Sequence, residues 1–260
     1  MKPLRQTLFS GETLPAAFLF LDQPDIAEII GLAGFPLMIV DREHAATDLG
    51  NALHSLRAIR STSNAFVMAR AQDGTPAAIK PLLDAGFDGI MVPDVRSADE
   101  ARAIAQAARY APIGRRGAQF TVSRAARYGA DKNHSEHANN SLLVAVMIES
   151  RAGLEAITDI AATPGIDMLF LGPLDLTTDY GTFGELGAPE LSEALQTAEQ
   201  AILATDKLLG GAALPDQDPA DLFARGYALV SATSDVGLMR DAAAQAYQEI
   251  QRRRVAMATA

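Results

Sequence analysis

Short apolar segments recur along the chain and alternate with longer segments in which apolar residues follow a helical period. The short segments predict eight strands, at residues 16–21, 36–41, 65–70, 89–93, 143–149, 167–172, 209–213 and 227–232. Helical spacing lies between them, at residues 26–33, 76–85, 98–110 and 190–205. Strands that alternate with helices pair in parallel, because a crossover between parallel strands needs a dozen or more residues.

Eight strand–helix units in a chain of 260 residues match the size of a closed (β/α)8 barrel. The alternative is an open doubly wound sheet, which usually carries a glycine-rich phosphate turn after its first strand. Here the first predicted strand runs into Asp22-Gln23-Pro24-Asp25, which contains no glycine. We therefore predict one barrel domain over residues 1–260, interrupted by a polar segment at 111–140 and ending in an amphipathic helix over 234–254.

Composition and net charge limit the classes of partner that the protein can bind. With 48% hydrophobic residues, 21% charged residues and a mean hydropathy of +0.07, the chain can bury a large core. A formal net charge of −10 without a basic stripe argues against nucleic acid and against anionic membranes. The apolar runs are far shorter than the roughly 20 residues that cross a bilayer, and residues 1–10 lack the apolar core of a signal peptide, so we expect a cytoplasmic protein.

Charged side chains follow several predicted strands at the ends where barrel enzymes place their chemistry. The fifth strand ends at Glu149, and the sixth runs into Asp175. Neighbouring strands lie roughly 5 Å apart, so these two carboxylates repel unless a cation or a proton lies between them. An all-oxygen site favours Mg²⁺ or Mn²⁺. The alternative for either carboxylate is a cap of the following helix.

The second and third predicted strands end at Asp41 and Arg70, and His44 follows three residues after Asp41. A carboxylate at this spacing would hold the imidazole in one tautomer, which gives a base with its orienter. Arg70 would direct its guanidinium toward the barrel mouth, where an anionic ligand would compensate its charge. A salt bridge to Asp41 or Glu43 is the alternative.

Other residues exclude or weaken further types of site. The absence of cysteine excludes thiolate nucleophiles and zinc–thiolate sites. A Schiff-base mechanism needs a lysine near the catalytic end of a strand, and we expect neither that nor an organic cofactor, because the four lysines lie elsewhere, at Lys2, Lys80, Lys132 and Lys207. The sequence His-Ser-Glu-His at residues 134–137 has the composition of a metal cluster but lacks an apolar scaffold, so we interpret it as the start of a solvated helix.

Six separated stretches of the sequence are characteristic when taken together and in this order: MIVDREH, FVMAR, IKPLLDAGFDGIMVP, ARYAPIGRRG, VMIES and MLFLGPLDL. With them the chain resembles, over nearly its whole length, the HpcH/HpaI family of metal-dependent 2-oxo-acid aldolases, such as 2,4-dihydroxyhept-2-ene-1,7-dioate aldolase and 2-dehydro-3-deoxyglucarate aldolase. The resemblance implies a (β/α)8 TIM barrel of the phosphoenolpyruvate/pyruvate-domain type. It further implies a class II aldolase, a carbon–carbon lyase that reversibly cleaves a 4-hydroxy-2-oxo acid to an aldehyde and pyruvate or a pyruvate-like acid such as hydroxypyruvate.

The same resemblance implies partners and roles for individual residues. The metal would be Mg²⁺ or Mn²⁺, with Co²⁺ or Zn²⁺ as alternatives, held by Glu149 and Asp175. His44 corresponds to the proton acceptor and Arg70 to the group that steadies the enolate oxygen. The protein would be a homohexamer, a trimer of dimers, whose protomers exchange the last helix. Contacts to the substrate would come from Arg70, Met147, Gly172, Pro173, Leu174 and Asp175.

Two further acids match the family pattern, and one residue departs from it. Asp41 and Asp84 correspond to acids that support the histidine, although Asp84 lies at a helix C-terminus, at the wrong end of its own barrel, so it would act from a neighbouring subunit or be structural. The family usually has glutamine where this chain has Met147, and methionine cannot donate a hydrogen bond to a substrate oxygen. Two alternatives stay open: a non-catalytic 2-oxo-acid-binding protein, or a CoA-thioester lyase of the citrate lyase β-chain type, with basic candidates Arg115, Arg116 and Arg124.

Overall fold

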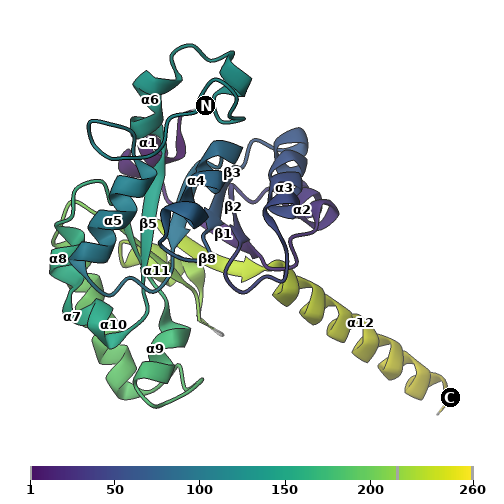
Figure 1. The fold of residues 1–260 in the computed structure, drawn as a ribbon. Coiled ribbons are helices and arrows are strands. Elements are labelled where there is room, and N and C mark those ends of the chain that lie inside the picture. The colour runs from purple at the N-terminus through teal and green to yellow at the C-terminus, as the bar shows by residue number, and fades with distance from the viewer. Residues whose placement is uncertain (1, 215–216, 259–260) are drawn as a thin grey trace.

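The computed structural model describes residues 2–214 and 217–258, in which eight parallel strands close into a barrel surrounded by helices (Figure 1). The strands are β1 (Leu14–Leu19), β2 (Leu37–Asp41), β3 (Phe66–Arg70), β4 (Gly89–Val92), β5 (Leu143–Ile148), β6 (Met168–Leu171), β7 (Leu208–Ala212) and β8 (Leu229–Ser234). Each strand pairs with the next one along the chain, and β8 pairs with β1. The predicted (β/α)8 barrel is confirmed, and each strand lies within a few residues of its expected position.

The helices are α1 (Leu4–Phe9), α2 (Pro24–Leu32), α3 (Leu49–Thr62), α4 (Pro76–Ala85), α5 (Ala98–Ala108), α6 (His134–Ser141), α7 (Arg151–Glu155), α8 (Ile157–Ala161), α9 (Pro173–Asp179), α10 (Pro189–Leu203), α11 (Pro219–Ala224) and α12 (Asp235–Ala258). Local sequence explains several boundaries: the side chains of Asp48 and Thr75 cap α3 and α4, and α4 ends at Gly86, whose φ of 91° suits glycine. Helix α1 was not expected, and Leu4 and Leu8 on it are buried among interior side chains of the barrel.

Side chains of each strand alternate between the barrel interior and the layer beneath the helices. In β2, Leu37 and Ile39 belong to the interior cluster, whereas Met38 and Val40 pack in the cluster that includes the helices. The interior parity then reaches Asp41 at the carboxyl end of the strand, and Asp41 is fully buried. The two-residue period of the strand therefore directs a charged side chain into the mouth of the barrel.

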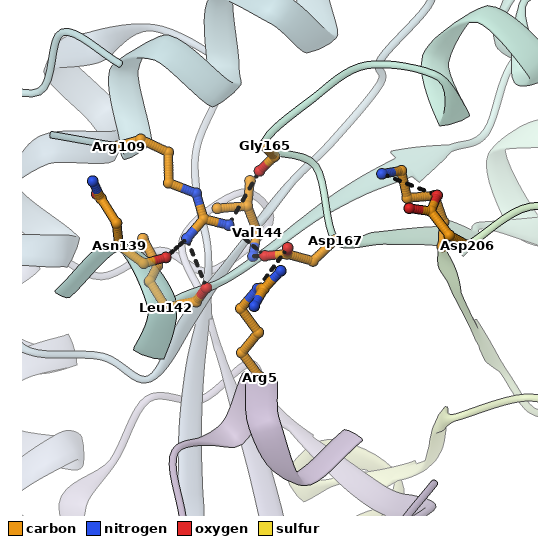
Figure 2. A network of polar contacts seen from close by, with 9 residues as sticks. Arg5, Arg109, Asn139, Leu142, Val144, Gly165, Asp167 and Asp206 are labelled. Atoms are coloured by element: carbon orange, nitrogen blue, oxygen red, sulfur yellow. Dashed lines mark hydrogen bonds and ion pairs between the residues drawn. The ribbon is translucent and has the colours of Figure 1, made fainter. Parts of the chain in front are cut away.

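A buried aspartate binds two arginines at the opposite end of the barrel (Figure 2). Asp167, which precedes β6, accepts hydrogen bonds from Arg5 Nε at 2.8 Å, from Arg109 Nη2 at 2.5 Å and from the backbone N–H of Val144 at 2.9 Å. Arg109 also donates to the carbonyl oxygen of Leu142 at 3.0 Å. These contacts tie α1 and the segment between α5 and β5 to the start of the barrel strands.

The last helix extends away from the barrel (Figure 1). The structure has a helix, α12, where an amphipathic helix was predicted over 234–254, and large apolar side chains along it are exposed, among them Leu238, Met239, Tyr247 and Ile250. Within the described part of the chain, no helix is both long enough and apolar enough to span a membrane.

Candidate active site

The carboxyl ends of the strands surround a cavity of about 860 Å³. Its wall includes His44, Arg70, Met147, Glu149 and residues 172–175, which come from the ends of β2, β3, β5 and β6 and the loops after them. These residues are far apart in the sequence, and the closed barrel brings them to one opening.

Strand parity explains why two of the charged side chains reach this cavity. In β3, Phe66 and Met68 lie in the interior cluster, so Arg70, two residues further on, continues the same face. In β5, Met147 lies in the interior cluster, and Glu149 follows at the same parity. Both charged side chains are buried, with exposed fractions of 5% each.

The carboxylate of Glu149 is enclosed and only half satisfied. Its Oε1 accepts a hydrogen bond from the backbone N–H of Asp94 at 2.7 Å, whereas its Oε2 is buried with no hydrogen-bond partner among the described residues. Gly172 lies against this oxygen, because a Cβ built there would come within 2.6 Å of it. Burial raises the pKa of Glu149 from its usual 4.5 to about 7; the hydrogen bond from Asp94 opposes this rise, and the nearby carboxylates of Glu43 and Asp175 add to it.

These donors fit a divalent cation. A buried carboxylate oxygen without a partner is unfavourable, and a cation beside it would satisfy it. Asp175, in the first turn of α9, is exposed on the wall of the same cavity and raises the pKa of Glu149 through its charge. Oxygen donors with room for water suit a hard ion such as Mg²⁺ or Mn²⁺ better than a soft one.

Arg70 is held in place from three sides. Its Nε donates to Asp41 at 2.5 Å, and its Nη1 lies 2.8 Å from Glu43 Oε2. Its guanidinium carbon lies 5.0 Å from the ring centroid of Phe18 and 5.8 Å from that of Phe20, a cation–π arrangement. The salt bridge offered as the alternative from sequence is thus present with both acids, and Arg70 still lines the cavity. Its positive charge has a fixed position suited to an anion.

Asp41 acts on the backbone of His44, which corrects the expectation that it orients the imidazole. Its carboxylate accepts hydrogen bonds from the backbone N–H groups of His44 at 2.8 Å and Glu43 at 3.3 Å, an Asx-type turn after β2. The side chain of His44 is 60% exposed, and its Nε2 lies 3.7 Å from Glu43 Oε2. Because Asp41 points into the barrel, the turn brings backbone amides to it, and the carboxylate that faces the imidazole is that of Glu43.

Asp84 does not join this cavity in its own chain. It lies near the end of α4, where it pairs with Arg116 at 2.6 Å. Arg124 donates to the carbonyl oxygen of Ala85 on the same helix, at 2.8 Å. Two of the basic residues considered for a CoA phosphate therefore contact α4, and neither lines the cavity at the barrel mouth.

Sequence reasoning missed several contributors. Glu43, whose pKa burial raises, contacts both Arg70 and His44, but it was considered only as an alternative partner of Arg70. Phe18 and Phe20 alternate at the end of β1, a pattern that could have predicted an aromatic wall at the mouth. The role of the Asp94 amide had no such signal, because a backbone N–H carries no mark of its partner in the sequence, and Asp94 and Glu149 lie 55 residues apart.

Comparisons with known proteins identify the family of the chain. A family model described as HpcH/HpaI aldolase/citrate lyase matches residues 16–242. The 2-keto-3-deoxy-L-rhamnonate aldolase of Shigella sonnei is 32% identical over 240 residues, covering 92% of this chain and 90% of that protein. The hydroxypyruvate/pyruvate aldolase of Delftia acidovorans is 35% identical over 241 residues, covering 93% and 89%. A solved HpcH/HpaI aldolase/citrate lyase family protein from Burkholderia cenocepacia superimposes with a TM-score of 0.89 at 31% identity, covering 95% of this chain and 98% of that one.

Proposed function

This chain belongs to the HpcH/HpaI aldolase/citrate lyase family and is a carbon–carbon lyase of the aldolase class, and from this premise we propose the reaction and the residues that carry it. The substrate is a 4-hydroxy-2-oxo acid, cleaved reversibly to an aldehyde and pyruvate or a pyruvate-like acid such as hydroxypyruvate. The observation that carries the proposal is that Glu149, Asp175, Arg70 and His44 all line one cavity at the carboxyl ends of the strands.

Glu149 and Asp175 hold a divalent metal ion, Mg²⁺ or Mn²⁺, with Co²⁺ or Zn²⁺ as substitutes. The support is the buried Oε2 of Glu149, which lacks a hydrogen-bond partner in the described chain and lies beside further carboxylates. When bound, the ion supplies positive charge for the carboxylate and keto oxygen of the 2-oxo acid and for the enolate that forms from it. No lysine is needed as an electron sink.

His44 accepts the proton of the substrate, and Arg70 stabilises the negative charge of the enolate. In cleavage, His44 accepts the proton of the C4 hydroxyl while the C3–C4 bond breaks, and the electron pair of that bond passes into the enolate as the aldehyde leaves. Arg70, held by Asp41 and Glu43, faces the enolate oxygen and neutralises it. Glu43 lies 3.7 Å from the His44 imidazole and stabilises its protonated form. The enolate then takes up one proton at C3 and His44 loses the proton that it accepted, which completes the 2-oxo acid and restores the free base.

The turn into α9 binds the carboxylate of the substrate. Gly172, Pro173, Leu174 and Asp175 line the cavity, and Leu174 is 59% exposed there. The backbone N–H groups of Leu174 and Asp175 are suited to an anion, because the first N–H groups of a helix have no partner within it. Met147 contributes an apolar contact to the same wall, where an amide side chain would have offered a hydrogen bond.

The protein assembles as a homohexamer, a trimer of dimers, in which α12 packs on a neighbouring protomer. The exposed apolar side chains of Leu238, Met239 and Tyr247 support this, because exposed apolar surface of that kind marks an interface. Asp84, which does not line the cavity of its own chain, would reach the cavity of a neighbour. Light scattering after gel filtration tests the assembly: a monomer at micromolar concentration would contradict it.

Turnover tests the function directly. The protein is incubated with Mg²⁺ or Mn²⁺, pyruvate or hydroxypyruvate, and a panel of aldehydes, and aldol products are identified by NMR. We expect product, and its loss after EDTA with recovery on adding metal. Full activity after dialysis against EDTA would refute the metal's role, and binding of the 2-oxo acid without product would identify a binding protein instead.

Two variants test the residue roles. Arg70→Ala and His44→Ala should fold, judged by circular dichroism, and lose about 10² to 10³ in kcat, the usual cost of one transition-state contact. His54→Ala is the matched control, because His54 is an exposed histidine on α3 that does not line the cavity. Wild-type kcat in His44→Ala would exclude this histidine as the base.

A further inference from the structure

Three potential metal ligands recur at every third position in the polar segment before β5: Asp131, His134 and His137. The two histidines lie one turn apart on α6, and Asp131 precedes the helix by three residues. One ligand atom from each side chain lies within 4.8 Å of the others. Among the described residues, this is the one group of three or more histidine and acidic side chains that approach one another so closely.

His134 supplies an independent sign that a ligand belongs here. Its side chain is buried, with 6% exposed, and neither Nδ1 nor Nε2 has a hydrogen-bond partner in the described chain. A buried imidazole nitrogen without a partner is unfavourable, and a metal ion is one of the few groups that could bind it there. Its ring lies 5.7 Å from that of His137 and 5.9 Å from that of Tyr110, both edge-on.

The burial of His134 results from tertiary packing, which the sequence pattern does not show. The sequence predicted that residues 134–137 start a solvated helix, and α6 does begin at His134. The prediction of a solvated position is wrong for His134, because α6 packs against α1 and Tyr110 covers the first turn. His137 remains half exposed, and its Nε2 lies 2.9 Å from Asp131 Oδ2.

The two histidines of the cluster border a cavity. His134 and His137 line a cavity of about 740 Å³ whose other wall residues include Phe66 and Leu142, at the starts of β3 and β5. It therefore lies at the end of the barrel opposite the candidate active site. Four arginines and Lys2 also line this cavity. Two of the arginines are paired with acids, Arg116 with Asp84 at 2.6 Å and Arg60 with Asp88 at 2.7 Å.

We propose that Asp131, His134 and His137 bind a second metal ion, of the zinc type, at the amino-terminal end of the barrel. Two imidazoles and one carboxylate suit Zn²⁺, Co²⁺ or Ni²⁺, whereas Mg²⁺ prefers oxygen alone. The ion would replace the hydrogen bond between Asp131 and His137 and would join α6 to the loop before it. The site is distinct from the oxygen donors at Glu149 and does not depend on the proposed reaction.

Cobalt and zinc titrations of the full-length protein test the site. In Glu149→Gln, which removes a ligand of the oxygen site, and with Mg²⁺ present, Co²⁺ should give visible d–d absorption at one equivalent, and calorimetry should show one equivalent of Zn²⁺. Zinc at 100 times its Kd should raise the melting midpoint by roughly 5 to 10 °C. The expected loss in affinity is at least about 100-fold for His137→Ala, which removes a direct ligand, and about 10-fold or more for Asp131→Asn, which replaces a charged carboxylate oxygen with a neutral amide oxygen. Both side chains are partly exposed, so these variants should fold.

Matched controls separate this site from others. Glu136→Gln changes an acid on the same helix that lies outside the cluster, and His54→Ala removes an exposed histidine elsewhere; both should bind zinc as the wild type does. Glu149→Gln should also retain it. The proposal is overturned if zinc binding survives in His137→Ala and Asp131→Asn, if it disappears in Glu149→Gln, or if the wild type binds no more tightly than His137→Ala.

Discussion

The buried carboxylate of Glu149 predicts a pH-dependent stability that Glu149→Gln should remove. Its pKa is raised from 4.5 to about 7 by burial in the metal-free protein. Between pH 4.5 and about 7 the folded state therefore binds more protons than the unfolded state. The free energy of unfolding consequently falls as pH rises through this range and stays low above pH 7. The pKa values differ by about 2.5, and each pKa unit corresponds to about 1.4 kcal/mol, so the charged carboxylate costs about 3 kcal/mol at pH 8.

In EDTA, Glu149→Gln should therefore be more stable than the wild type at pH 8, by up to about 3 kcal/mol, and nearly equal to it at pH 4. Urea unfolding followed by circular dichroism across this range measures the difference. Mg²⁺ should reverse the order at pH 8, because only the wild type gains free energy from the ion. Glu12→Gln, at an exposed position, controls for the loss of one charge. Equal unfolding free energies of wild type and Glu149→Gln at both pH values would refute the reasoning.

Three further variants probe neighbouring features. In Gly172→Ala, the new Cβ would lie 2.6 Å from Glu149 Oε2 and displace that oxygen, so the affinity for Mg²⁺, measured by calorimetry, should fall at least about tenfold, and unchanged affinity would contradict this. In Arg70→Lys, the loss of the fixed guanidinium should lower kcat about 10²-fold with a smaller change in KM, in a steady-state assay; an equal rise in KM with unchanged kcat would show a binding role only. In Asp167→Ala, Arg109 keeps a buried charge without its acid, so urea unfolding should show a loss of about 3 to 5 kcal/mol, and a loss under 1 kcal/mol would show that carbonyl contacts suffice.

The sequence determined the barrel and the side chains that reach its mouth. Alternating strands and helices predict parallel pairing, and the two-residue period of β2 and β3 sends Asp41 and Arg70 to the interior face at the strand ends. The same parity carries Glu149 to that face after β5. These outcomes could be read from the chain because strand periodicity is a local property of the backbone.

Only the tertiary structure decided which partner each of these side chains contacts and which of their atoms are buried. Asp41 accepts hydrogen bonds from backbone amides and from Arg70, whereas an imidazole partner was expected. The carboxylate beside the imidazole of His44 is that of Glu43. The burial of His134 depends on α1, a helix more than a hundred residues earlier in the chain. Partner choice and burial depend on segments that meet only when the chain closes, so no local pattern encodes them.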